Sequence, residues 1–265
     1  MPLDVPALRA ASQARARDRP RGPELDRVED LILPDTPAVR ARRYRVDAGG
    51  APRPTLVYLH GGMWVLGDLE SHDRLCRQIA AGAGVDVLAV DYRRAPEWRY
   101  PAPVEDAKAA VRWVRESTGA TTVGLGGDSA GGTIATLAAL ALRGEAGPDA
   151  LLLFCPNADL TADVASPEIV AAAHIWVPEA AARAAASPLL IDDLTGLPPT
   201  VLLTAEHDAL RAEGDALAAR LADAGVDVTH RAEPGAEHGF VMSDGAPLDR
   251  AIADVARALG ATAQR

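Results

Sequence analysis

The sequence predicts an α/β fold, in which helices cover both faces of a mostly parallel sheet. Short runs that are almost entirely apolar, such as 55–59 and 200–204, are typical of strands buried on both faces. These runs alternate with longer segments of helical periodicity, and that alternation indicates a parallel sheet with crossover helices. A third observation is the glycine-rich turn at 127–132, which joins a predicted strand to a predicted helix.

The expected elements follow one another along the chain without an internal repeat or a linker. The N-terminal segment, 1–26, shows weak helical periodicity interrupted by prolines, and edge strands are expected within 38–46. Further strands are expected at 55–59, 85–90, 121–125, 151–154, 200–204 and 226–230, and helices at 75–83, through Val111 and Val114, and at 133–142, 212–224 and 247–259. Residues 159–187 are alanine-rich and have no strand character. We therefore expect one domain, 1–265, with 1–26 and 159–187 as cap pieces.

The composition argues against several classes of protein. The chain has 265 residues, of which 48% are hydrophobic and 24% charged, as in a globular protein with a substantial core. Its formal net charge of -10 argues against nucleic acid or an anionic membrane as a partner. No apolar run is long enough to span a bilayer, and the first residues lack the apolar core of a signal peptide, so we expect a cytoplasmic location. Cys76 and Cys155 lack metal-ligand spacing, so we expect buried free thiols and no metal.

The glycine-rich turn reads Gly-Asp-Ser-Ala-Gly-Gly and contains the candidate nucleophile, Ser129. A Gly-x-Ser-x-Gly sequence between a strand and a helix is a nucleophile elbow, whose tight turn lifts the serine hydroxyl clear of the sheet. The alternative is a phosphate-binding turn at a helix N-terminus. That alternative fits poorly, because the turn lacks the Gly-Lys-Ser/Thr of a P-loop and Asp128 would repel an anion.

A serine hydroxyl needs a neighbouring base, and the base needs an acid that orients it. His238 lies in a glycine-flanked loop after the last predicted strand, and Asp208 lies in the loop after strand 200–204. In a parallel sheet these loops meet at one edge, so we expect His238 as base and Asp208 as acid. Asp208 could also cap the following helix, which does not exclude catalysis.

Three neighbouring residues compete for these two roles. His230 lies inside an alternating strand, and His207 directly precedes Asp208 and would struggle to turn back toward it. Glu206 is the nearest competitor for the acid. We rank all three below His238 and Asp208.

The attack also needs backbone N–H groups where negative charge develops. The loop His60-Gly61-Gly62-Met63 follows a predicted strand and matches the oxyanion loop that accompanies this elbow. We expect the amides of Gly61, Gly62, Met63 and Ala130 to form the oxyanion hole. The alternative is an ordinary Gly-Gly turn. His72 either orients this loop or caps a helix.

These residues resemble the hormone-sensitive-lipase-like branch (bacterial family IV) of the α/β-hydrolase esterases. The resemblance runs from about residue 28 to the end, through 60–62, 64–72, 91–93, 95–97, 127–132, 187–189, 205–214 and 238–240. It implies an α/β-hydrolase fold, hydrolysis of esters with short to medium acyl chains, the triad and oxyanion donors named above, and no cofactor. The chain departs from the family at Met63 (usually glycine), Arg94 (usually leucine) and Cys155 (usually aromatic), and both cap pieces are short. Met63 is therefore expected to narrow or reshape the pocket, and a positive φ there would be costly.

The resulting hypothesis is a serine esterase that acts on small or short-acyl esters. Trp64, Trp176 and Phe240 are expected to line its substrate pocket. The first alternative is an amide deacylase with the same triad, and the second is a ligand-binding protein without catalysis, which an intact triad argues against. The expected partner is a small ester or amide, without nucleic acid or membrane, and a homodimer stays open.

Overall fold

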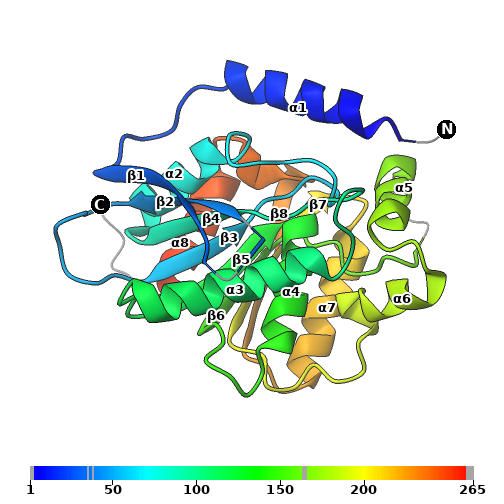
Figure 1. Ribbon diagram of the computed structural model, residues 1–265. Coiled ribbons are helices and arrows are strands. Elements are labelled where there is room, and N and C mark those ends of the chain that lie inside the picture. Colours follow the sequence, from blue (N-terminus) through cyan, green and yellow to red (C-terminus); the bar gives the residue numbers. More distant parts are fainter. Residues whose placement is uncertain (1–2, 35, 38, 163–165, 261–265) are drawn as a thin grey trace.

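The computed structural model describes residues 3–34, 36–37, 39–162 and 166–260. An eight-stranded sheet crosses the middle of the molecule in the order β1-β2-β4-β3-β5-β6-β7-β8 (Figure 1). Its strands are β1 (Arg27–Ile32), β2 (Arg40–Arg45), β3 (Thr55–Leu59), β4 (Asp86–Asp91), β5 (Val123–Asp128), β6 (Ala150–Phe154), β7 (Thr200–His207) and β8 (Val228–Glu237). The pairs β1–β2 and β2–β4 are antiparallel, and all the other neighbours are parallel. The expected mostly parallel sheet is confirmed.

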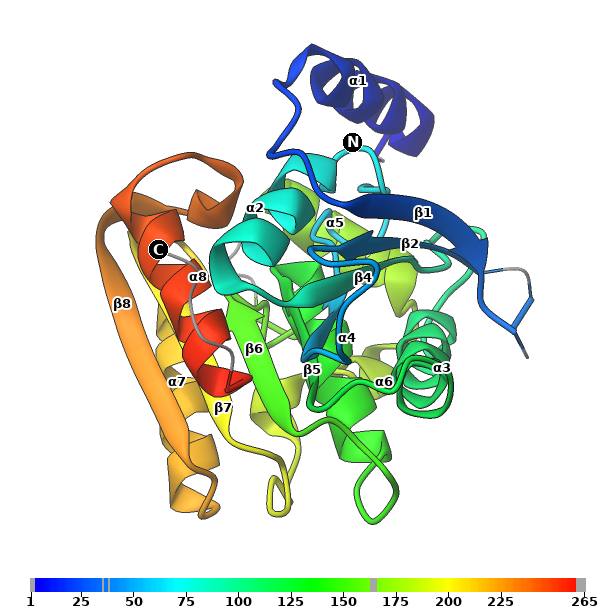
Figure 2. The same ribbon diagram turned by 90° about the vertical axis from the view of Figure 1, so that its left-hand side faces the viewer.

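Two layers of helices explain why the central strands are apolar throughout. Helices α2 (Asp73–Ala83) and α8 (Ala246–Ala258) pack on one face of the sheet, and α3 (Ala102–Ser117), α4 (Ala130–Ala141) and α7 (Arg211–Asp223) pack on the other (Figure 2). Because successive side chains of a strand point to opposite faces, β3 sends Val57 and Leu59 into one core and Leu56 and Tyr58 into the other. A strand covered on both sides therefore has no polar face.

Two further segments lie at the edge of the sheet where the parallel strands end. Helix α1 (Val5–Asp18) lies across one side, and α5 (Pro167–Trp176), α6 (Ala180–Ala185) and the 3-10 turn η1 (Pro188–Leu190) follow β6 (Figures 1 and 2). They occupy most of the expected cap pieces, 1–26 and 159–187. Residues 1–2 and 163–165 of those pieces lie outside the described residues. No helix in the described ranges is long and apolar enough to span a membrane.

Most expected elements are confirmed within a few residues. The main differences are β1, which the sequence did not indicate, and β8, which continues to Glu237 rather than ending near residue 230. In addition, α4 begins at Ala130, immediately after the elbow serine, rather than at residue 133. Strands β5, β7 and β8 end at Asp128, His207 and Glu237, so that Ser129, Asp208 and His238 each directly follow a strand.

Candidate active site

Ser129 occupies a strained turn that only small neighbours permit. Its φ is 52°, in the left-handed region, and its backbone N–H donates to the carbonyl of Phe154 at 2.9 Å. A Cβ on Gly127 would lie 2.1 Å from the carbonyl oxygen of Leu59, and one on Gly131 would lie 1.9 Å from the same atom. The two glycines are therefore required where the elbow passes β3, and the turn points Oγ of Ser129 away from the sheet.

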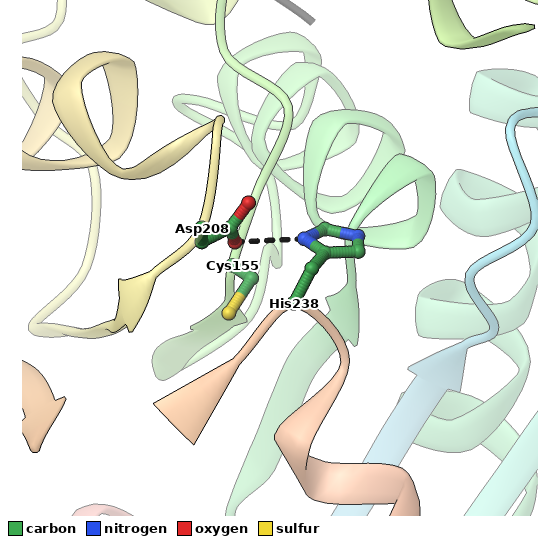
Figure 3. A group of neighbouring side chains, drawn as sticks. All are labelled: Cys155, Asp208 and His238. Carbon is green, nitrogen blue, oxygen red and sulfur yellow. Dashed lines mark hydrogen bonds and ion pairs between the residues drawn. The ribbon is translucent and has the colours of Figure 1, made fainter. Parts of the chain in front are cut away.

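His238 joins Ser129 to Asp208 through its two ring nitrogens. Nδ1 lies 2.7 Å from Oδ2 of Asp208 (Figure 3). On the other side of the ring, Nε2 lies 3.0 Å from Oγ of Ser129. Asp208 also accepts the N–H of Leu210 at 2.9 Å in the turn before α7, but the N-cap residue of α7 is Leu210 and the helix has no side-chain cap. The structure thus brings together the three side chains that the sequence indicated, from three separate loops.

Asp208 and His238 shift each other's pKa values in opposite directions. Burial disfavours the charge of Asp208, but the hydrogen bond to His238 and its charge hold the pKa of this carboxyl below its usual value. Burial likewise opposes the charged imidazole, whereas the hydrogen bond to Asp208 and its charge raise the pKa of His238 overall. Because an ionised carboxylate only accepts, Nδ1 carries a proton, and in the neutral imidazole Nε2 accepts from the Ser129 hydroxyl.

Two of the three competing residues are engaged elsewhere. His230 lies 3.0 Å from Asp215 through Nε2, and Glu206 accepts the N–H of Gly235 at 2.6 Å. Neither contacts His238 or Ser129 by a hydrogen bond within the described part of the chain. The ranking of His238 and Asp208 above these two is consistent with the geometry.

The loop after β3 corrects one expectation about the oxyanion hole. The N–H of Gly61 donates to Oδ1 of Asp128 at 3.0 Å, so it is not available to a substrate. The N–H groups of Gly62, Met63 and Ala130 donate to no acceptor in the described ranges. Met63 adopts φ 54°, the left-handed conformation that the sequence analysis identified as costly for a side chain.

The Asp128 side chain, at the end of β5, hydrogen-bonds this loop to the strand that leads into the nucleophile elbow. Its Oδ1 also accepts the hydroxyl of Tyr58 at 2.8 Å and lies 3.4 Å from Nε2 of His72. Burial alone would raise the pKa of Asp128, but the His72 imidazole and these hydrogen bonds lower it to about 2. His72 precedes α2 without forming a side-chain cap, so of its two expected roles the geometry favours orienting the loop.

His60, at the start of the same loop, is buried and neutral. Its ring stacks on Tyr92 with centroids 4.2 Å apart, and the Tyr92 hydroxyl donates to the His60 carbonyl at 2.8 Å. Burial lowers the pKa of His60 to about 3. This histidine therefore packs beneath the loop and takes no part in proton transfer.

A cavity of about 550 Å³ opens above Ser129 and His238. Its walls combine α1, the oxyanion loop and the start of α5, with Ser12, Arg15, Arg19, Met63, Leu66, Glu168, Ile169 and Met242 among the lining residues. Both expected cap pieces thus contribute to the wall. The lining positions on α1 and α5 were not predictable from the sequence, because their pattern is that of ordinary solvent-facing helix residues.

The three expected pocket aromatics do not line this cavity. Trp64 and Trp176 are fully buried and stack on each other, with centroids 4.9 Å apart and planes 7° from parallel. Phe240, in the 3-10 turn η2 (Phe240–Met242), is buried in the core formed with α8. The expectation was wrong because an aromatic in a functional motif can equally well support the loop from the core side.

Cys155 lies beside Asp208 and His238 (Figure 3), with one potential ligand atom from each residue within 4.8 Å of the others. Both Cys155 and Cys76 are buried free thiols, as expected. Burial raises the pKa of the Cys155 thiol, which opposes the thiolate that a metal ion needs. Moreover, the Asp208–His238 contact of 2.7 Å is shorter than the roughly 3.4 Å between ligands of a tetrahedral zinc site. The group fits a hydrogen-bonded acid–base pair better than a metal site.

Comparisons with known proteins agree with this fold. A family model described as the alpha/beta hydrolase fold matches residues 56–242. The carboxylic ester hydrolase LipN of Mycobacterium tuberculosis is 38% identical over 267 residues, covering 90% of this chain and 70% of the relative. The ethyl acetate hydrolase of Pseudomonas putida is 33% identical over 261 residues, covering 89% and 82%. Among solved structures, the hyperthermophilic esterase from the archaeon Pyrobaculum calidifontis has a TM-score of 0.86 at 32% identity, covering 97% and 93%.

Proposed function

This chain is a carboxylic ester hydrolase of the α/β-hydrolase family, in its hormone-sensitive-lipase-like branch, and we propose that Ser129, His238 and Asp208 form its catalytic triad. The observation that supports the proposal best is the hydrogen-bonded chain from Oγ of Ser129 through both nitrogens of His238 to Asp208. An exposed hydroxyl on a strained elbow, a base in reach and a buried acid are the three parts of an activated nucleophile.

In the proposed mechanism, Oγ of Ser129 attacks the ester carbonyl while Nε2 of His238 takes the hydroxyl proton. The negative charge that develops on the carbonyl oxygen is met by the N–H groups of Gly62, Met63 and Ala130. His238 then gives its proton to the departing alcohol, leaving an acyl group on Ser129. A water molecule, deprotonated by His238, releases the acid by the same route.

We further propose that the substrates are small or short-acyl esters. The cavity is about 550 Å³ in volume, and the Met63 side chain lines it beside the oxyanion amides. The similarity to a relative named for the hydrolysis of ethyl acetate supports the same size range. The amide deacylase remains the alternative, because an amide would use the same triad with a poorer leaving group.

The first test is hydrolysis of p-nitrophenyl acetate, butyrate and octanoate by wild type and Ser129→Ala. We expect turnover of the short esters, and a loss on the order of a millionfold in Ser129→Ala because the nucleophile is gone. Ser117→Ala, at the exposed end of α3, is the matched control and should retain full activity. Full activity of Ser129→Ala would exclude the triad, and a higher rate on acetanilide than on the matched acetyl ester would favour the amide alternative.

Three finer expectations stay predictions: one domain with two cap pieces, a cytoplasmic location and no nucleic-acid partner. The first is supported by the walls that 1–26 and 159–187 contribute to the cavity. The last is supported by the formal net charge of -10, which repels phosphate backbones. A gel-shift titration with duplex DNA at low salt tests it, and we expect no complex.

A further inference from the structure

A buried carboxyl outside the triad, Glu213, lies on the first turn of α7. The residue is only 6% exposed. Its Oε1 accepts from Nδ2 of Asn157 at 3.0 Å and from the N–H of Ala158 at 2.9 Å. The other oxygen, Oε2, is buried and accepts no hydrogen bond from the described residues. Glu213 therefore has one well-satisfied oxygen and one without a donor.

Asn157, the hydrogen-bond partner of Glu213, also has an oxygen without a hydrogen-bond donor. Asn157 is 3% exposed, and its Oδ1 is also buried without a donor in the described part of the chain. Two acceptors thus lack donors on two side chains that already share a hydrogen bond. An acceptor buried without a partner is costly, and a proton on the carboxyl of Glu213 would provide a donor that these two acceptors lack.

The charges around Glu213 also disfavour a carboxylate. No arginine, lysine or histidine in the described ranges forms an ion pair with it. The titratable groups that face it are Asp159, from the segment after β6, Asp208, before α7, and His238, after β8. The two aspartates are like charges, and Asp208 already neutralises the imidazolium form of His238.

We propose that Glu213 is a neutral carboxylic acid in the working enzyme and is a positioning residue that forms a two-point acid–amide pair with Asn157. In this pair Nδ2–H of Asn157 donates to Oε1, and Oε2–H of Glu213 donates to Oδ1. Both planar groups are then fully hydrogen-bonded without any buried charge.

The titration of Glu213 falls where this pair would respond to pH. Burial raises the pKa of Glu213 to about 7, and the charges of Asp159 and Asp208 add to this effect, while the N–H of Ala158, which donates to Oε1, opposes it. The acid–amide pair is therefore complete at mildly acidic pH. It loses its proton, and one of its two hydrogen bonds, above neutrality.

The pair connects the loops that hold the proposed triad. The Asn157 carbonyl accepts the Thr133 hydroxyl of α4 at 2.6 Å, and Ala158 accepts the N–H of Leu189 at 2.9 Å. Glu213 itself lies in the helix that follows Asp208. The pair thus connects the loop after β7 to α4, the helix that follows Ser129, and to η1, the turn that follows α6. The effect of this pair on turnover rests on the proposed triad, whereas the protonation state of Glu213 can be tested without it.

The experiment compares wild type with Glu213→Gln, since glutamine keeps the acceptor and provides a permanent N–H donor for Oδ1. Glu116→Gln, at an exposed position of α3, is the matched control. Infrared difference spectra should show the C=O stretching band of a protonated carboxylic acid below pH 7 in wild type and in the control, and not in Glu213→Gln. In Asn157→Ala the same band should shift, because the acid loses its partner.

Thermal unfolding gives an independent measurement. A carboxyl whose pKa is raised on folding stabilises the protein at low pH, and this contribution is lost as pH rises through about 7. We therefore expect the Tm of wild type to fall relative to Glu213→Gln between pH 5 and pH 9, and the alkaline decline in kcat to be reduced in the variant. Parallel Tm profiles together with the absence of the protonated band would overturn the proposal. An inactive enzyme that still shows the band would count against the triad alone.

Discussion

Met63 holds a backbone conformation that side chains rarely adopt, at a position where its amide faces the proposed oxyanion. Its φ of 54° and that of Trp64, 58°, both lie in the left-handed region. For a residue with a Cβ this conformation costs roughly 1–2 kcal/mol. The stacking of Trp64 on Trp176 in the core holds the loop in place, and the Met63 side chain forms part of the cavity wall.

We predict that Met63→Gly relaxes the selectivity for acyl-chain length. Glycine accepts the left-handed conformation without strain and opens the wall beside the acyl group. The ratio of kcat/KM for octanoate over acetate should rise by at least about tenfold, the effect of a few methylenes in an apolar pocket. Met63→Leu keeps the bulk and is the control, whose ratio should stay near that of wild type. An unchanged ratio in Met63→Gly would show that the acyl group lies elsewhere.

For single residues, the sequence predicts which side chains take part in the reaction more reliably than which residues contact one another. Ser129, Asp208 and His238 were predictable because their residue types, their loops and their order along the chain are all required by one reaction. The engagement of Gly61 by Asp128 was not, since it depends on how β3 lies beside β5. The pocket roles of Trp64 and Trp176 failed for the same reason, because an apolar ring gives no sign of whether it faces a cavity or the core.

Helix α1 illustrates how a weakly amphipathic element is fixed in place. Only Val5 of its residues is buried, so apolar packing contributes little. Instead, Arg9 donates to both carboxylate oxygens of Glu97, at 2.7 and 2.8 Å, and to the carbonyls of Val65 and Ala95, each at 2.8 Å. Charge-assisted, bidentate hydrogen bonds of this kind are stronger than neutral ones, so Arg9 supplies much of the attachment of α1.

We predict that Arg9→Ala loosens α1 and weakens substrate binding more than turnover. Because α1 supplies Ser12, Arg15 and Arg19 to the cavity wall, its displacement opens the site. A loss of about 1.4 kcal/mol in the free energy with which α1 docks on the protein corresponds to a tenfold change in the ratio of docked to undocked α1. KM should therefore rise by up to about tenfold, while kcat stays within a few-fold. Steady-state kinetics on p-nitrophenyl butyrate measure this. Arg17→Ala, an exposed position on the same helix, should change neither constant, and an unchanged KM in Arg9→Ala would mean that α1 does not shape the site.

Element boundaries were predictable in the middle of the sheet and not at its edges. Strands β3 to β7 are covered on both faces, so their apolar runs mark them directly. β1 reads Arg-Val-Glu-Asp-Leu-Ile and has no buried residue, and its strand conformation follows from pairing with β2 rather than from its own pattern. The outer half of β8 is similarly polar, and its pairing with β7 carries it to Glu237.

Over the whole molecule, one edge of the sheet gathers every proposed functional group. β3, β5, β7 and β8 all end there, with β6 between β5 and β7, and each contributes the loop that directly follows it. These loops differ in length and sequence, so their alignment depends on connections between them. Asp128 is one of these connections, because it is the last residue of β5 and accepts hydrogen bonds from Tyr58 of β3 and from the Gly61 amide.

We predict that Asp128→Asn destabilises the fold in a pH-dependent way. The pKa of Asp128 is lowered from 3.8 to about 2, so its stabilising contribution is complete above about pH 4 and is lost as pH falls through about 2. A shift of this size corresponds to about 2 kcal/mol. Urea unfolding should therefore show a constant deficit for Asp128→Asn between pH 5 and pH 7, and a shrinking deficit below pH 4. Asp227→Asn, an exposed position before β8, is the control and should follow wild type throughout. A deficit that does not depend on pH would assign the effect to packing alone, whereas the expected profile would show that the charge of Asp128 holds the oxyanion loop to the nucleophile strand.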